Sequence, residues 1–177
     1  MIWKSEGNFA IINTPKDGRC KPELLCWLTS GIGLPWDRIL IVSHTRGDIQ
    51  TGYNLAIRSA LQTTNAEQFI FCDDDIRPVH NLMSPWINAK EDVVGCVYNT
   101  AGGDFAFASD SIIHAGLWRT HRSVLETIKP PWFSWIWSED GSTFTGCLCS
   151  YFCKKVKEAG FTISASGFAN HSLDRWH

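Results

Sequence analysis

Three consecutive carboxylates, Asp73 to Asp75, directly follow the apolar run 69–72. Adjacent carboxylates repel one another, and the repulsion grows beside a low-dielectric interior. A bound divalent cation would remove this cost. In extended backbone, side chains alternate between two faces, so Asp73 and Asp75 share one face and Asp74 takes the other. The spacing favours a hard-cation site at Asp73-x-Asp75, completed by water and phosphate oxygens. A solvated acidic turn is the ordinary alternative.

The elements around the triplet would place it at the edge of a sheet. Run 69–72 is too short for a helix and predicts a buried strand that ends at the carboxylates. Runs 8–14 and 39–42 also predict strands, and helical patterns over 21–29 and 49–63 separate the three. This alternation is typical of parallel βαβ units. Such sheets bind ligands at the carboxyl ends of their strands, where the triplet lies.

The second half of the chain predicts further elements of the same kinds. We expect a short helix at 79–87, a strand at 92–98, a hairpin-like extension from 105–108 and 112–115, a helix at 118–128, a helix from about Thr145 to Gly160, and a strand at 161–165. Large aromatic residues gather in 132–141, outside any periodic element. Because exposed apolar groups are costly, this loop either fills the core or covers a ligand.

Composition narrows the class of protein. A length of 177 residues predicts one domain. The net charge of −2, without a basic stripe, argues against nucleic-acid binding. No apolar run is long enough for a transmembrane segment, and the first residues lack the pattern of a signal peptide. Seven cysteines without a secretion signal therefore indicate reduced thiols in a cytoplasmic protein.

Several motifs, taken in order, resemble a small GT-A-fold glycosyltransferase of the family-two type found in viral and environmental sequences. The residues that carry the resemblance are Tyr53-Asn54, the strand with Asp73 to Asp75, Gly116 to Arg119, Pro131 to Phe133, Tyr151 to Gly160, and His171. The resemblance implies an α/β fold in which residues 1–177 form a single GT-A (Rossmann-like) domain. Its sheet would be mostly parallel and twisted, and helices would flank it.

The same resemblance implies a metal-dependent transfer of a sugar from a UDP- or GDP-sugar to an unknown acceptor. Mn²⁺ or Mg²⁺ would be held by Asp73 and Asp75, with His171 after the last strand as a third ligand. Ligation requires a neutral imidazole, so metal binding should weaken as the pH falls toward about 6. Asn54 and Arg19 are candidate nucleotide contacts, although a helix-surface amide and a solvated loop cation are equally ordinary interpretations.

The sequence departs from the family at the general base. The resemblance places a Glu-Asp pair at Leu148 and Cys149, neither of which is a carboxylate. Asp140 and Glu139, a few residues upstream, are the candidate replacements. Alternatively, the enzyme is retaining, or the chain is a catalytically weakened sugar-nucleotide-binding protein. A nucleotidyltransferase on a related sheet is a further alternative. The donor, the acceptor and the formation of a homo-oligomer stay open.

Overall fold

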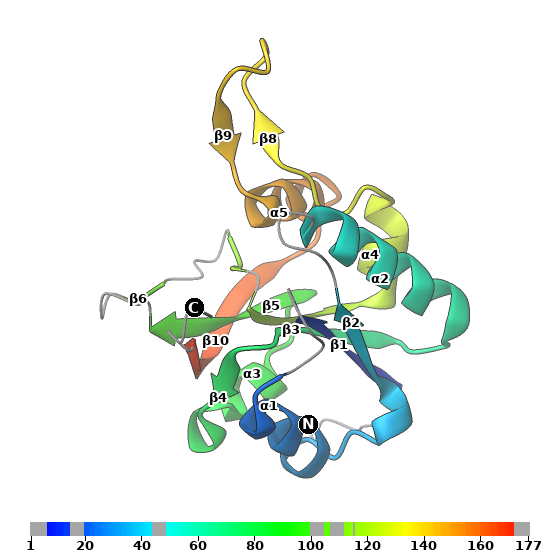
Figure 1. Cartoon of the computed structure of the whole chain (residues 1–177), viewed down its shortest axis with the longest axis vertical. Helices are drawn as coiled ribbons and strands as arrows, with labels where there is room; N and C mark the ends of the chain where they lie inside the picture. The colour runs from blue at the N-terminus through cyan, green and yellow to red at the C-terminus, as the bar shows by residue number, and fades with distance from the viewer. Residues whose placement is uncertain are drawn as a thin grey trace.

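An eight-stranded sheet forms the centre of the described chain, in the strand order β2-β1-β3-β7-β5-β10-β4 with β6 beside β5 (Figure 1). The computed structural model describes residues 7–14, 20–43, 49–99, 105–106, 112–114 and 116–171. The strands are β1 (Asn8–Thr14), β2 (Ile39–Ser43), β3 (Gln68–Asp73), β4 (Ile76–Pro78), β5 (Val93–Asn99), β6 (Phe105–Ala106), β7 (Leu117–His121) and β10 (Ile163–His171).

Five of the eight strands in this sheet, β1, β2, β3, β5 and β10, point the same way, although only three of the neighbouring pairs are parallel. β1 pairs in parallel with β2 and β3, and β5 pairs in parallel with β10. β7 lies between β3 and β5 and is antiparallel to both, so these two point the same way. β4 is antiparallel to β10. The expected α/β class with a mostly parallel sheet is therefore confirmed.

Strand β7 corrects the prediction of a helix over 118–128. Residues 117–120 are all buried between β3 and β5. The Trp118 ring stacks on Phe71 with centroids 4.0 Å apart. Only the later part of the segment is helical, as α4 (Arg122–Ile128), which buries Val124 and Leu125. A run buried on both faces has no clear period, so the helical spacing of the later residues was wrongly extended backward.

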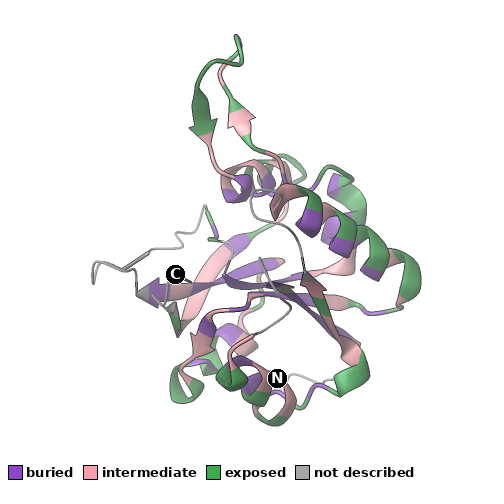
Figure 2. Ribbon diagram, in the orientation of Figure 1, coloured by how far each residue is buried: buried purple, intermediate pink, exposed green. Residues whose placement is uncertain are grey.

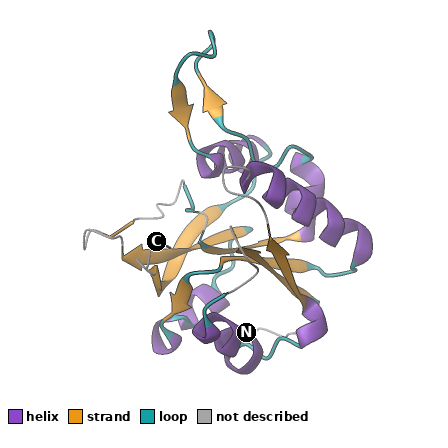
Figure 3. Ribbon diagram, in the orientation of Figure 1, coloured by secondary structure: helices purple, strands orange, loops and turns teal. Residues whose placement is uncertain are grey.

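Helices cover both faces of the sheet (Figure 3). α2 (Ile49–Thr63), α4 and α5 (Leu148–Glu158) pack on one face, and α1 (Pro22–Cys26) and α3 (Ser84–Asn88) pack on the other. A π-helical turn, Trp27–Gly31, extends α1, and 3-10 turns occur at Trp36–Arg38 and His80–Leu82. Within the described ranges, no helix has the length and apolar character needed to cross a membrane.

Two predicted helices differ from the structure at their first residues. Pro85 lies in the first turn of α3, so the expected helix over 79–87 is a 3-10 turn followed by a short helix. The last helix begins at Leu148 rather than near Thr145, because Phe144 to Gly146 form a strand. Gly160 follows its C-terminus with a φ of +84°, as expected of a glycine that ends a helix.

The aromatic segment divides between core and surface. Trp132 and Phe133 are buried, which confirms the core alternative for these two residues. The chain then forms a hairpin from β8 (Ile136–Trp137) and β9 (Phe144–Gly146), which projects beyond α5 (Figure 1). Trp137 and Phe144 are 56% and 49% exposed on this hairpin, which is mainly exposed along its length (Figure 2).

Candidate metal and sugar-nucleotide site

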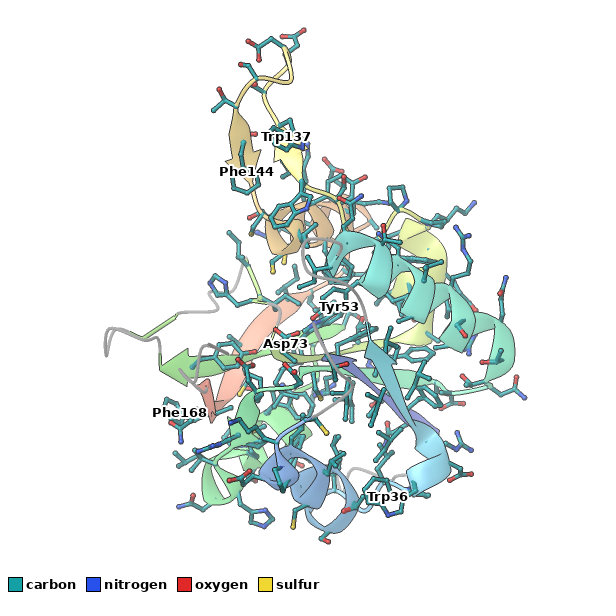
Figure 4. All side chains as sticks on the ribbon, viewed as in Figure 1. Trp36, Tyr53, Asp73, Trp137, Phe144 and Phe168 are labelled. Atoms are coloured by element: carbon teal, nitrogen blue, oxygen red, sulfur yellow. The ribbon has the colours of Figure 1, made fainter. Side chains whose placement is uncertain are left out.

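Asp73 ends strand β3, and a tyrosine on α2 holds its carboxylate. The Tyr53 hydroxyl donates a hydrogen bond to Asp73 Oδ1 at 2.7 Å (Figure 4). Tyr53 is fully buried, whereas Asp73 is half-buried. The backbone N–H of Asp73 donates to the carbonyl of Gly116 at 2.6 Å, which ties the end of β3 to the start of β7. The carboxylate is thus fixed at the carboxyl end of a central strand, where α/β sheets bind ligands.

The two following aspartates differ in exposure. Asp74 is only 5% exposed, and its carbonyl accepts a hydrogen bond from the Lys21 N–H at 2.8 Å. Asp75 is half-buried, like Asp73. Asp74 is therefore more buried than Asp73 and Asp75, but Asp74 and Asp75 lie in the turn between β3 and β4 and not in the extended backbone that the sequence predicted.

The sheet brings the backbone of His171 next to this pair. β10 pairs with β4 so that His171 lies opposite Ile76, the residue that follows Asp75. The backbone of this predicted third ligand therefore lies opposite the residue that directly follows the acidic triplet. The His171 side chain is outside what the structure describes, so its role as a ligand stays a prediction.

The chemistry of these residues fits a divalent ion shared with a substrate. The described side chains contain no group of three or more His, Cys, Asp or Glu residues that would enclose a metal by themselves. Mg²⁺ is usually bound through one or two carboxylates together with waters and substrate phosphates. Asp73 and Asp75 are two half-buried carboxylates at and just after the end of β3, so they match a site that a diphosphate would complete.

Asn54 is occupied by contacts with the protein backbone. Its amide donates to the carbonyls of Gln50 and Phe133, each at 2.8 Å, and its Oδ1 accepts from the N–H groups of Trp132 and Phe133. These bonds fix the chain that leads into the hairpin. They give no support to a nucleotide contact by Asn54. The other predicted nucleotide contact, Arg19, lies outside the described residues.

The candidate bases lie at the tip of the hairpin. Asp140 Oδ1 accepts from the hydroxyls of Ser138 and Ser142 at 2.6 and 2.7 Å, and from the Ser142 N–H at 3.0 Å. These bonds lower the pKa of Asp140 to about 2. Glu139 is exposed beside it. Figure 4 places Trp137, which precedes both, well away from Asp73. The structure therefore does not bring Asp73 and the candidate bases together.

The positions that the family resemblance assigns to the general base are part of the core. Leu148 and Cys149 are 5% and 8% exposed at the start of α5.

All seven cysteines lie in described segments, and each is a free thiol. Burial raises the pKa of Cys96 to about 12 and that of Cys153 to about 11. These protonated thiols are suited to packing and not to proton abstraction near neutral pH.

Two contacts of the site region were missed by sequence reasoning. The bond from Tyr53 to Asp73 joins residues of different elements, and its only sequence signal is a tyrosine on the inward face of a helix. Arg119 falls within the helix expected over 118–128, but it is instead 3% exposed in β7. Its guanidinium donates to the carbonyls of Trp86 and Ala89, so its role is structural.

Solved structures show the fold of the chain. It is similar to A197 from STIV, with a TM-score of 0.65, 18% identity, and coverage of 94% of this chain and 86% of that one. The catalytic domain of Drosophila β1,4-galactosyltransferase 7, in complex with xylobiose, gives a TM-score of 0.64 at 13% identity, with coverage of 96% and 72%. The same enzyme is known with manganese, UDP-Gal and xylobiose.

A third similar structure is the mannosyltransferase PcManGT from Pyrobaculum calidifontis, in complex with GDP-Man and Mn²⁺. Its TM-score is 0.57 at 15% identity, and the match covers 96% of this chain and 57% of the mannosyltransferase. No protein-family model and no curated protein sequence matches the chain. The strand order, the two helical layers and these structures together show that the chain has the GT-A fold.

Proposed function

We propose that the chain is a metal-dependent glycosyltransferase that moves a sugar from a UDP- or GDP-sugar to an acceptor. The observation that carries the proposal is the carboxylate of Asp73, which Tyr53 fixes at the carboxyl end of β3 in a GT-A fold. Asp75 is half-buried two residues further on, and the backbone of His171 is opposite the next residue, Ile76. Two glycosyltransferases of similar fold, solved with a nucleotide sugar and manganese, support this assignment.

In this function, Asp73, Asp75 and His171 would be the residues that hold the divalent ion. The bound ion supplies positive charge that stabilises the diphosphate leaving group. The protein contributes the orientation of the ligands. The hydrogen bond from Tyr53 fixes the carboxylate of Asp73. The pairing of His171 with Ile76 places the backbone of His171 beside the acidic triplet.

We assign the general base to Asp140 or Glu139. In this role the base removes the proton of the acceptor hydroxyl as the glycosidic bond breaks. The hairpin would have to bend toward Asp73 when the acceptor binds. Release of the serine bonds would also raise the pKa of Asp140 from about 2 toward its ordinary value, which would make it a stronger base.

A second candidate function is sugar-nucleotide binding without turnover. The observation that favours it is the burial of Leu148 and Cys149, which leaves the start of α5 without a carboxylate. In that case Asp73 and Asp75 would still bind a metal and a nucleoside diphosphate.

One experiment separates these functions. The protein is incubated with UDP- and GDP-sugars and Mn²⁺, and the release of nucleoside diphosphate is followed with and without a chelator. Asp75→Asn should abolish metal-dependent release, whereas Asp37→Asn, an exposed aspartate on the 3-10 turn Trp36–Arg38, should leave it unchanged.

Each outcome points to a different conclusion. Metal-dependent release of UDP or GDP supports the glycosyltransferase. Tight binding without release supports the second candidate. Release of pyrophosphate from a nucleoside triphosphate and a sugar phosphate would indicate a nucleotidyltransferase. If neither binding nor release is observed, the proposal is wrong.

A further inference from the structure

Packing immobilises the hydroxyl of Tyr53 beside the metal-site carboxylate. The Tyr53 ring has no exposed surface and lies between two aromatic neighbours. Its centroid is 4.8 Å from that of Phe133 and 6.4 Å from that of Phe71. A ring held on two sides in this way has one accessible rotamer, so its hydroxyl has a fixed position relative to β3.

The bond from this hydroxyl has consequences for Asp73. The bond from Tyr53 to Asp73 Oδ1 is 2.7 Å long, and hydrogen bonds to ionised carboxylates are about twice as strong as those between neutral groups. Because Oδ1 accepts from Tyr53, rotation of the carboxylate about its last bond is restricted. The orientation of Oδ2 is then set by α2 and not by the strand alone. Hydrogen bonds of this kind, which orient a ligand, tune metal affinity in other metalloproteins.

The next residue along α2 extends the same arrangement. Asn54 holds the backbone of Trp132 and Phe133, and the Phe133 ring contacts that of Tyr53 in a tilted arrangement. One turn of α2 therefore orients both the carboxylate of Asp73 and the start of the segment that forms the hairpin. The inward face of α2 is in this respect part of the site and not only part of the core.

We infer that Tyr53 is a positioning residue, whose hydroxyl holds the Asp73 carboxylate in the orientation that binds the divalent ion. The inference rests on the proposed function, because it requires a metal at Asp73. Tyr53 itself touches neither the metal nor the substrate. It acts through the carboxylate, and its removal should change metal affinity before it changes the maximal rate.

The test is Tyr53→Phe, which keeps the ring and removes the hydroxyl. Binding of Mn²⁺ in the presence of UDP or GDP is measured from the electron paramagnetic resonance signal of free Mn²⁺. The expected result is a Kd for Mn²⁺ raised about tenfold or more, the range found when a ligand-orienting bond is lost. Saturating Mn²⁺ should restore the rate of nucleotide release.

Tyr98→Phe is the matched control. Tyr98 is also a buried tyrosine, but the hydrogen bonds described for its hydroxyl join backbone groups of Leu117 and His114. This variant should lose thermal stability and keep the wild-type Kd for Mn²⁺. An unchanged Kd in Tyr53→Phe, or an equal rise in both variants, would overturn the positioning role.

The two proposals fail in different ways. If wild type binds Mn²⁺ and Asp73→Ala does not, the metal site is present, and an unchanged Kd in Tyr53→Phe then removes only the inference. If wild type binds no Mn²⁺ with either nucleotide, the proposed function fails, and the inference fails with it.

Discussion

Asn54 and Phe133 are joined by two hydrogen bonds, although 79 residues separate them in the chain. The Asn54 amide donates to the Phe133 carbonyl at 2.8 Å, and its Oδ1 accepts from the Phe133 N–H at 3.2 Å. The same oxygen accepts from the Trp132 N–H at 2.8 Å. A single side chain on α2 thus satisfies the polar backbone of a segment that has no strand or helix partner of its own.

Asn54→Ala should therefore destabilise the protein by about 2–3 kcal/mol, because it leaves partly buried N–H and carbonyl groups without partners. Urea denaturation measures the change. Asn88→Ala is the control, since Asn88 is exposed on α3 and the hydrogen bonds described for its side chain are local ones to Ser84. It should cost less than about 0.5 kcal/mol. Equal effects in the two variants would contradict a special role for Asn54.

Arg119 provides a second prediction, on a buried cation. Its guanidinium donates three hydrogen bonds to the carbonyls of Trp86 and Ala89, and burial lowers its pKa to about 10. Arg119→Met should cost about 3 kcal/mol, since the carbonyls lose their donors. Arg58 is exposed on α2 and provides the control. Arg58→Met should change the free energy of unfolding by less than about 0.5 kcal/mol. If Arg119→Met instead lost nucleotide binding without losing stability, Arg119 would be a residue of the nucleotide site and not a structural one.

The sequence predicted those features that depend on local periodicity. The strand that ends at Asp73 follows from a short apolar run, and the bounds of α2 follow from a regular apolar face. Asp74 and Asp75 form the turn after β3, so their difference in burial does not follow from the two-residue period of a strand. Strand β7 has no such signal, because Trp118 and Arg119 are buried on opposite sides of a central strand. Its helical prediction failed for this physical reason.

Contacts between distant elements could not be predicted in the same way. The Tyr53 bond to Asp73 depends on how α2 packs across β3. The placement of His171 opposite Ile76 depends on the antiparallel register of β4 and β10. The family resemblance suggested His171 without this register. It could not indicate that Asn54 binds backbone, because the same amide on a differently packed helix would be free to bind a nucleotide.

Cys147 leads to a prediction on thiol reactivity. It precedes α5 as its N-cap, and hydrogen bonds from Cys149 and then from Ser150 lower its pKa to about 4. Because the pKa is lowered, the thiolate persists as the pH falls through about 6, where an ordinary thiol with a pKa of about 8.5 is protonated. Iodoacetamide at that pH should label Cys147 before the exposed Cys26, as measured by peptide mass spectrometry.

Ser150→Ala gives the control for this reactivity. It removes the hydroxyl 3.2 Å from Cys147 Sγ and leaves the helix N-terminus in place. The labelling rate of Cys147 at the lower pH should fall, while that of Cys26 should not change. Equal labelling of both thiols in wild type would show that the hydrogen bonds do not hold a thiolate at Cys147.

The assignment of the general base is tested by Asp140→Asn and Glu139→Gln. A positioned acid or base contributes at least about a hundredfold, so loss of the true base should lower turnover by more than tenfold. Ser142→Ala is a useful companion, because it removes one hydroxyl bond from Asp140 and retains the carboxylate. If neither carboxylate variant lowers turnover, the base is elsewhere.

The pH dependence of turnover distinguishes two positions of the hairpin in the reacting complex. One is the position seen in the structure, and the other is bent toward Asp73. With three hydrogen bonds from Ser138 and Ser142, Asp140 has a pKa of about 2 and is ionised at every pH at which the enzyme would be assayed. In that state, protonation of Asp140 would cause no fall in turnover (no acid limb of the pH–rate profile) at any pH above about 4, which is the ordinary pKa of an aspartate. An acid limb that disappears in Asp140→Asn would mean that the serine bonds break in the reacting complex, because only then would the pKa of the carboxyl rise into the measured range. A limb that survives this substitution would assign the titration to another group.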